Sequence, residues 1–234
     1  MKEQEDFIIQ VPYRPSERET KAITELTKKG LEPSDWESQK VGILSFKDNL
    51  REHMWHEQNF RCAYCRIEIP LACCFLQREH IVPKALHPKW MFEPRNLCFT
   101  CDRCNNYKND KEVISNYTSE DYPVSSEKFL IVNPYIDKYS DHINLVNDLI
   151  YEGKTNKGYF TIDTCQLSRL DLPLERARRK MEKENPSAVM AQLLSLLSAR
   201  QITQDEIKNI KRKIENIVKR YKSHFDSDST ERNM

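Results

Sequence analysis

The sequence predicts an α+β protein in which a small, metal-organised unit with short strands is embedded in helices. Three observations support this fold class. Capped, amphipathic helical segments lie towards both ends of the 234-residue chain, strand-like runs broken by Pro and Gly lie between them, and four of the eight cysteines form two Cys-x2-Cys pairs. With 38% hydrophobic residues, such a chain forms one or two domains with a modest core.

The overall charge is nearly balanced, because 37 Lys and Arg residues face 36 Asp and Glu residues. No global positive field attracts nucleic acid, so any such binding has to rest on local patches. The sequence contains no signal-like apolar run near its start and nothing close to the ~20 apolar residues of a membrane span. We therefore expect a cytoplasmic protein without a membrane partner. In that reducing compartment, cysteines bind metal or are buried more often than they form disulfides.

A capping box predicts the first helix, over residues 16–29. Ser16 is the expected N-cap, Glu19 is the acidic residue three positions on, and Gly30 is a C-terminal stop signal. We assign residues 1–44 to an N-terminal extension made of this helix and a loop.

A second helix is predicted to start at Ser45, a good N-cap residue, and to lead directly into the cysteine region. Its apolar side chains recur every four residues at Phe46, Leu50 and Met54. We assign residues 45–115 to one unit, because Cys, Pro and Asn are mixed with short apolar runs throughout it.

Residues 116–171 are predicted to form a small β layer. The runs FLIVNP and GYFTI look like strands, and Pro134 and Gly158 punctuate them.

Residues 172–234 are predicted to be helical, with a polar tail. One charged helix runs to about Glu184, Asn185-Pro186 breaks it, and a leucine-rich helix follows. A capping box at Thr203 opens a last helix with an apolar stripe at Ile207, Ile210, Ile214, Ile217 and Tyr221. Two explanations of the stripe stay open: these helices pack on each other, or they dock onto a partner protein.

The two cysteine pairs predict a structural zinc site, because four thiolates complete a tetrahedron. The predicted ligands are Cys62, Cys65, Cys101 and Cys104. The alternative is that these are simply buried apolar cysteines. Cys98 is another candidate, three residues before Cys101, but it falls in a strand-like run in which burial is the simpler explanation.

A zinc ribbon alone does not require the residues that accompany these pairs. In chain order they are Arg78-Glu79-His80-Ile81-Val82-Pro83, Asn96-Leu97 and Cys104-Asn105-Asn106-x-Lys108. In order and spacing this sequence resembles the HNH (ββα-metal) endonuclease family, over about fifty residues. The resemblance implies two strands and a helix around a catalytic cation, and cleavage of phosphodiester bonds.

The resemblance also assigns roles to residues. It implies that His80 is the general base, a role for which the ordinary pKa of imidazole, near ~6.5, is well suited. It implies that Asn96 braces the loop that orients His80.

Glu79 and Asn105 are implied to bind the catalytic Mg²⁺ or Mn²⁺ through oxygen atoms, which these ions prefer. Asn106 stays open as an alternative to Asn105. Lys108 is predicted to contact a phosphate of the nucleic acid. The sequence departs from the pattern in two places: Glu79 stands where many members have Asp, and no glycine follows Lys108.

Outside this motif, the chain resembles a narrower group, the HNH proteins of Septu-type and retron-linked anti-phage defence systems. The similar pieces are Cys62-Ala63-Tyr64-Cys65, Phe129-Leu130-Ile131-Val132-Asn133-Pro134, Thr161-Ile162 and Leu167-Ser168-Arg169. This resemblance implies a defence effector controlled by a partner ATPase of the ABC/SMC-like type, and the chain has no phosphate loop of its own. We expect a nucleic-acid substrate, DNA rather than RNA. The competing predictions are a non-cleaving zinc module that binds nucleic acid and a structural adaptor.

Overall fold

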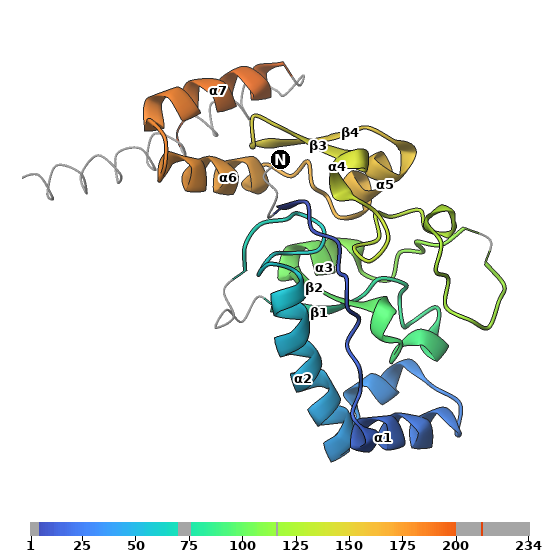
Figure 1. The fold of residues 1–234 in the computed structure, drawn as a ribbon. Helices are drawn as coiled ribbons and strands as arrows, with labels where there is room; N and C mark the ends of the chain where they lie inside the picture. Colours follow the sequence, from blue (N-terminus) through green and yellow to red (C-terminus); the bar gives the residue numbers. More distant parts are fainter. Residues whose placement is uncertain (1–4, 70–75, 116, 200–211, 213–234) are drawn as a thin grey trace, which may run out of the picture. The chain divides into compact units, whose positions relative to one another are not determined.

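The computed structural model describes residues 5–69, 76–115, 117–199 and 212 (Figure 1). These residues fall into two compact units. The first contains the chain up to Asn144 together with Tyr151–Leu167, and the second contains Leu145–Ile150 and the residues from Ser168 onward. The elements combine helices with two small two-stranded sheets, so the α+β class is confirmed.

Helix α1 (Glu17–Thr27) begins as predicted from its capping box. The Ser16 hydroxyl accepts a hydrogen bond from the Glu19 amide, and the Glu19 carboxylate accepts one from the Ser16 amide at 2.8 Å. Two of the free amides at the helix start are thereby satisfied. The sequence prediction for this helix is confirmed.

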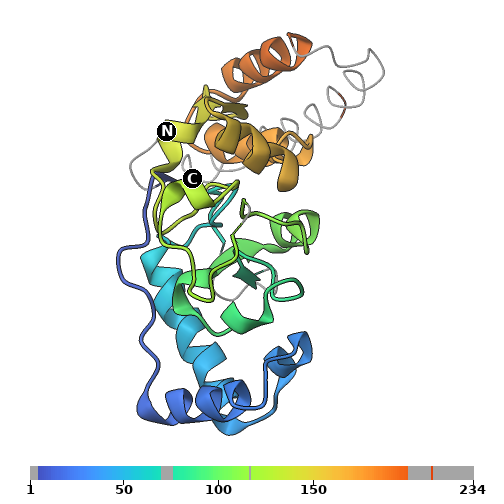
Figure 2. The ribbon, with the colours of Figure 1, turned by 90° about the vertical axis from the view of Figure 1, so that its right-hand side faces the viewer.

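Helix α2 (Val41–Glu57) packs against α1 and leads towards the cysteine region (Figures 1 and 2). The predicted start at Ser45 is wrong, because the helix begins four residues earlier. Ser45 lies inside the helix, where its hydroxyl donates to the Glu19 carboxylate at 2.8 Å. The sequence could not show this competing acceptor, which lies on another element.

Strands β1 (Leu76–His80) and β2 (Leu97–Cys101) form an antiparallel pair in which His80 lies opposite Leu97. Between them the chain makes two short 3-10 helices, η3 (Pro88–Trp90) and η4 (Pro94–Asn96). Helix α3 (Asp102–Lys108) follows β2 at once and packs on both strands. The chain therefore contains two strands and a helix in the order β1, β2, α3 at the position that the sequence indicates.

The predicted β layer exists, but other residues form it. The hairpin consists of β3 (Ile143–Val146) and β4 (Ile150–Gly153), preceded by η5 (Ser126–Lys128) and the short helix α4 (Tyr139–His142). The run FLIVNP contributes only an isolated bridge between Phe129 and Ile114.

The run GYFTI is helical, so its prediction as a strand is wrong. It lies in α5 (Asn156–Thr164), whose N-cap Thr155 accepts a hydrogen bond from the Gly158 amide. The cap and the burial of Gly158 and Thr161 on one helical face outweigh the β propensity of the aromatic and β-branched residues.

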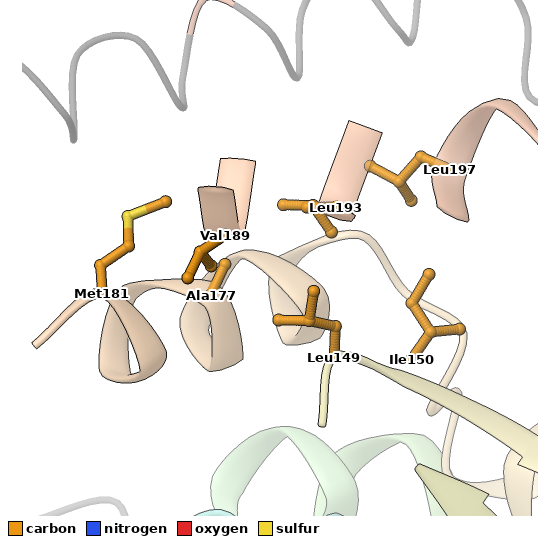
Figure 3. Packing of buried hydrophobic residues seen from close by; sticks show 7 residues of the cluster. All are labelled: Leu149, Ile150, Ala177, Met181, Val189, Leu193 and Leu197. Carbon is orange, nitrogen blue, oxygen red and sulfur yellow. The ribbon is translucent and has the colours of Figure 1, made fainter. Parts of the chain in front are cut away.

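In the second unit, α6 (Asp171–Met181) and α7 (Pro186–Ser198) confirm the two predicted helices and the break between them. Asn185 caps α7 by accepting hydrogen bonds from the amides of Ser187 and Ala188. Figure 3 shows the core of this unit, which consists of Leu149, Ile150, Ala177, Met181, Val189, Leu193 and Leu197. The predicted helix from Thr203 lies outside the described residues. Among the helices that are described, none is both long and apolar enough to cross a membrane.

Gly158 allows the close approach of α5 to α4, because a Cβ atom at this position would overlap the carbonyl oxygen of His142. We expect Gly158→Ala to lower the free energy of unfolding by about 3 kcal/mol, through overpacking against backbone that cannot rotate away. Asn156→Ala, at an exposed position in the same helix, is the matched control and should change little. Urea unfolding of both variants measures the difference; equal stabilities would contradict this packing.

Candidate metal centre and active site

Four cysteine sulfurs lie together as predicted, from Cys62, Cys65, Cys101 and Cys104. All four are within 4.8 Å of one another, and the Sγ atoms of Cys65 and Cys101 are 3.9 Å apart. A zinc–sulfur bond of about 2.3 Å gives a tetrahedron with edges of about 3.8 Å, so the spacing fits a zinc ion. Cys98 is buried but stands outside this group, so its interpretation as a core residue is confirmed.

Backbone hydrogen bonds hold each pair of cysteines in a tight turn. In the first turn, the Arg66 amide donates to the Cys62 carbonyl at 3.1 Å. In the second, Cys101 ends β2 and is the N-cap of α3, with its sulfur accepting from the Cys104 amide at 3.5 Å. The second pair therefore fixes where α3 begins.

Arg66 places a buried positive charge beside the cysteine cluster. Its guanidinium lies between the rings of Phe7, at 3.7 Å, and Tyr139, at 4.5 Å. Within the described part of the chain, none of its three side-chain nitrogens has a hydrogen-bond partner. Burial lowers the pKa of Arg66 to about 10, against the opposing influence of Tyr139 and Cys62. Zinc with four thiolates has a net charge of −2, which would compensate this buried cation.

Three tyrosine hydroxyls tie the segment after α3 back to the cysteine region. Tyr139 donates to the Tyr64 carbonyl at 2.7 Å, and Tyr151 donates to the Cys65 carbonyl. Tyr135 donates to the Leu97 carbonyl at 2.7 Å. Nothing in the local sequence indicated these contacts, because each partner is distant along the chain.

His80 is the last residue of β1 and is only 7% exposed. Its Nε2 lies 3.1 Å from the Met91 carbonyl oxygen. Because a carbonyl only accepts hydrogen bonds, Nε2 carries the proton, and the free lone pair is on Nδ1. Burial lowers the pKa of His80 to about 3, which keeps the imidazole neutral.

Asn96 forms hydrogen bonds to two parts of the loop between β1 and β2. Its Oδ1 accepts from the Val82 amide at 2.7 Å, and its Nδ2 donates to the Val82 carbonyl at 3.0 Å and the Trp90 carbonyl at 3.1 Å. The side chain is fully buried. It therefore fixes the backbone two residues after His80 and one residue before Met91.

Glu79 is 5% exposed and contacts two polar groups. The Lys108 ammonium lies 2.6 Å from its Oε1, and the Tyr64 hydroxyl donates to the same oxygen at 3.3 Å. Burial raises the pKa of Glu79, and Lys108 opposes the rise. Lys108 also donates to the His80 carbonyl at 2.9 Å and has no exposed side-chain surface. A contact between Lys108 and a phosphate thus requires the side chain to leave this ion pair.

Asn105 is half-buried, whereas Asn106 is exposed. Residues three apart share a helix face, so Asn105 lies on the face of α3 that carries Lys108. Asn106, two residues before Lys108, does not. This geometry favours Asn105 over Asn106 as a residue that faces Glu79.

Trp36 is a site residue that the sequence did not indicate. It lies in η2 (Pro33–Glu37), and its ring meets the His80 ring edge to face at a centroid distance of 4.5 Å. The Lys47 ammonium lies 5.0 Å from the same indole. Trp36 therefore forms one wall around the imidazole.

The second prediction concerns zinc. We expect the purified chain to contain about one Zn²⁺, and Cys104→Ser to lose it together with much of the fold, because a four-thiolate site supplies folding free energy. Cys98→Ala is the matched control and should keep the metal. Elemental analysis of the three proteins decides, and a well-folded chain without zinc would contradict the assignment.

The third prediction uses Arg66→Leu, which keeps much of the bulk of the side chain but removes its charge. In the zinc-loaded protein we expect a loss of about 3 kcal/mol in the free energy of unfolding, because the anionic cluster loses its counter-charge. The same variant should bind zinc more weakly, since no buried guanidinium then balances the charge of the thiolates. Urea unfolding of the zinc-loaded proteins and competition with a chelator for the metal test this, and unchanged stability together with unchanged zinc affinity would exclude the charge pairing.

No family model matches the chain. Over 113 residues the chain is 32% identical to a protein of Bacillus thuringiensis described as Septu protein PtuB. The matched region covers 48% of this chain and 38% of that protein. The similarity confirms the resemblance to a Septu-type protein over about half of the chain.

Proposed function

We propose that the chain is a metal-dependent HNH-type endonuclease that hydrolyses phosphodiester bonds in nucleic acid and acts in anti-phage defence. One observation carries the proposal: the buried imidazole of His80, the residue that follows Glu79 at the end of β1, is held in one tautomer by the hydrogen bond from its Nε2 to the Met91 carbonyl. The Asn96 side chain in turn holds the backbone at Val82 and Trp90, which lie close in sequence to His80 and Met91. The order β1, β2, α3 agrees with the arrangement that the family resemblance implies.

In this mechanism, His80 accepts a proton from the attacking water at Nδ1. The hydrogen bond from Nε2 to the Met91 carbonyl fixes the ring and stabilises the imidazolium that forms. An anionic phosphate beside the ring raises the pKa of His80 from its low value in the free protein, since a nearby negative charge favours the protonated form. Asn96 keeps the loop in place while the proton moves.

Two residues, Glu79 of β1 and Asn105 of α3, have side chains that would suit a hard divalent cation. Glu79 offers a carboxylate and Asn105 an amide oxygen, which are donor types that suit Mg²⁺ and Mn²⁺. When bound, such an ion supplies positive charge to the phosphate oxygens and to the leaving 3′ oxygen. The zinc site has a different task, because four thiolates leave no open position for substrate.

The defence role and the partner rest on similarity. The Septu relative supports a part in a defence system, and we propose an ABC/SMC-like ATPase as the regulating partner, since the chain has no phosphate loop of its own. We propose DNA rather than RNA as the substrate.

A second candidate function is a non-cleaving zinc module that binds nucleic acid or serves as an adaptor. The low exposure of Glu79 and His80 favours it, because a closed site does not admit a phosphate. Such a module needs the four cysteines but not His80.

We expect the full chain, alone or with its co-purified partner and ATP, to cleave plasmid DNA in the presence of Mg²⁺ or Mn²⁺. His80→Ala should reduce single-turnover cleavage by about 100-fold or more while zinc content and circular dichroism stay unchanged, as expected for loss of a general base. His56→Ala, an exposed histidine of α2, is the control and should cleave normally.

Cleavage by His80→Ala at the wild-type rate would contradict the mechanism. Binding of nucleic acid without cleavage, even in the complex, would favour the zinc module instead. Parallel assays on RNA decide the substrate.

A further inference from the structure

Lys108 has no exposed side-chain surface and contacts both residues of the Glu79-His80 pair. Its ammonium lies 2.6 Å from the Glu79 carboxylate and 2.9 Å from the His80 carbonyl oxygen. The Glu79 side chain is 6% exposed, so water screens this ion pair little. A buried carboxylate is costly without a cation, and Lys108 supplies that cation from the last turn of α3.

The same oxygen cannot serve two cations well. A divalent ion binds a carboxylate oxygen at about 2.1 Å, so with Lys108 in place two like charges would lie within about 5 Å of each other in a poorly screened site. The Tyr64 hydroxyl also donates a hydrogen bond to this oxygen, at 3.3 Å. Two of the chain's own groups thus already contact Oε1.

We propose that Lys108 is the internal counter-ion of Glu79, and that a divalent cation must displace it from the carboxylate. The structure then describes the form of the site before this displacement. In this form the Lys108 ammonium is ion-paired with the Glu79 carboxylate and connects the end of β1 to the end of α3. The inference rests on the proposed function for the identity of Glu79 as a metal ligand. It changes the role of Lys108 from a simple phosphate contact to a control on metal binding.

The first test measures Mn²⁺ binding to the full, zinc-loaded chain by calorimetry and by electron paramagnetic resonance, without nucleic acid. Lys108→Met keeps the length of the side chain but removes the competing charge, so it should bind Mn²⁺ at least about tenfold more tightly than the wild type. Its melting temperature should also rise more on addition of Mn²⁺. Glu79→Gln with Lys108→Met, which removes both charges, is the matched control and should lose the added affinity.

The second test needs no variant. Reductive methylation followed by peptide mass spectrometry reports which lysines of the wild-type chain are accessible. We expect Lys108 to resist the reagent without metal and to react when Mg²⁺ is added, while the exposed Lys128 reacts in both states. This measurement tests the displacement of Lys108 from Glu79 even if Lys108→Met does not fold.

Equal or weaker Mn²⁺ binding by folded Lys108→Met would overturn the proposal, as would a Lys108 that stays protected at saturating Mg²⁺. Neither result bears on whether the wild type cleaves nucleic acid. Conversely, tighter Mn²⁺ binding by the variant would support the proposal even if no cleavage were found, so the two can fail separately.

Discussion

The approach of four cysteine sulfurs from two separate turns determines the surroundings of Glu79. Tyr64, whose hydroxyl contacts the carboxylate, lies between Cys62 and Cys65 in the first turn. The helix that carries Lys108 begins at Cys101 in the second. Because the two turns meet at one cluster, the Tyr64 hydroxyl and the Lys108 ammonium both reach Oε1 of Glu79. The cluster therefore does more than hold the fold together, because it sets the polarity and the access of the candidate active site.

Much of this arrangement could be predicted from local signals. The box at Ser16 and Glu19, the break at Asn185-Pro186 and the Cys-x2-Cys spacing each depend on residues within a few positions of one another. These predictions hold in the structure because each pattern involves residues close in sequence, whose relative positions depend mainly on the local backbone. The resemblance added what spacing alone does not give: roles for Glu79 and His80.

What could not be predicted depends on contacts between distant residues. Ser45 has the residue type of a helix N-cap, but its hydroxyl donates a hydrogen bond to Glu19 of another helix. The run GYFTI has residue types that favour a strand. It is nevertheless helical, because Thr155 caps the helix and Gly158 packs closely against the His142 carbonyl. Lys108 looks like a surface cation in the sequence, whereas its burial follows from the position of Glu79 on a strand about thirty residues earlier.

The three tyrosine hydroxyls have a consequence for how the chain forms during synthesis. All four cysteines have been synthesised once Cys104 has left the ribosome, while Tyr135, Tyr139 and Tyr151 emerge later. A nascent chain can therefore bring the four sulfurs together first, with the carbonyls of Tyr64, Cys65 and Leu97 still hydrated, and the tyrosine hydroxyls then replace that water. Two of these late contacts join residues 75 and 86 positions apart, so closing them costs more chain entropy than joining Cys65 to Cys101, which are 36 positions apart. Residues 45–115 contain every residue to which we assign chemistry, yet three carbonyls within this range accept hydrogen bonds from tyrosines that lie outside it.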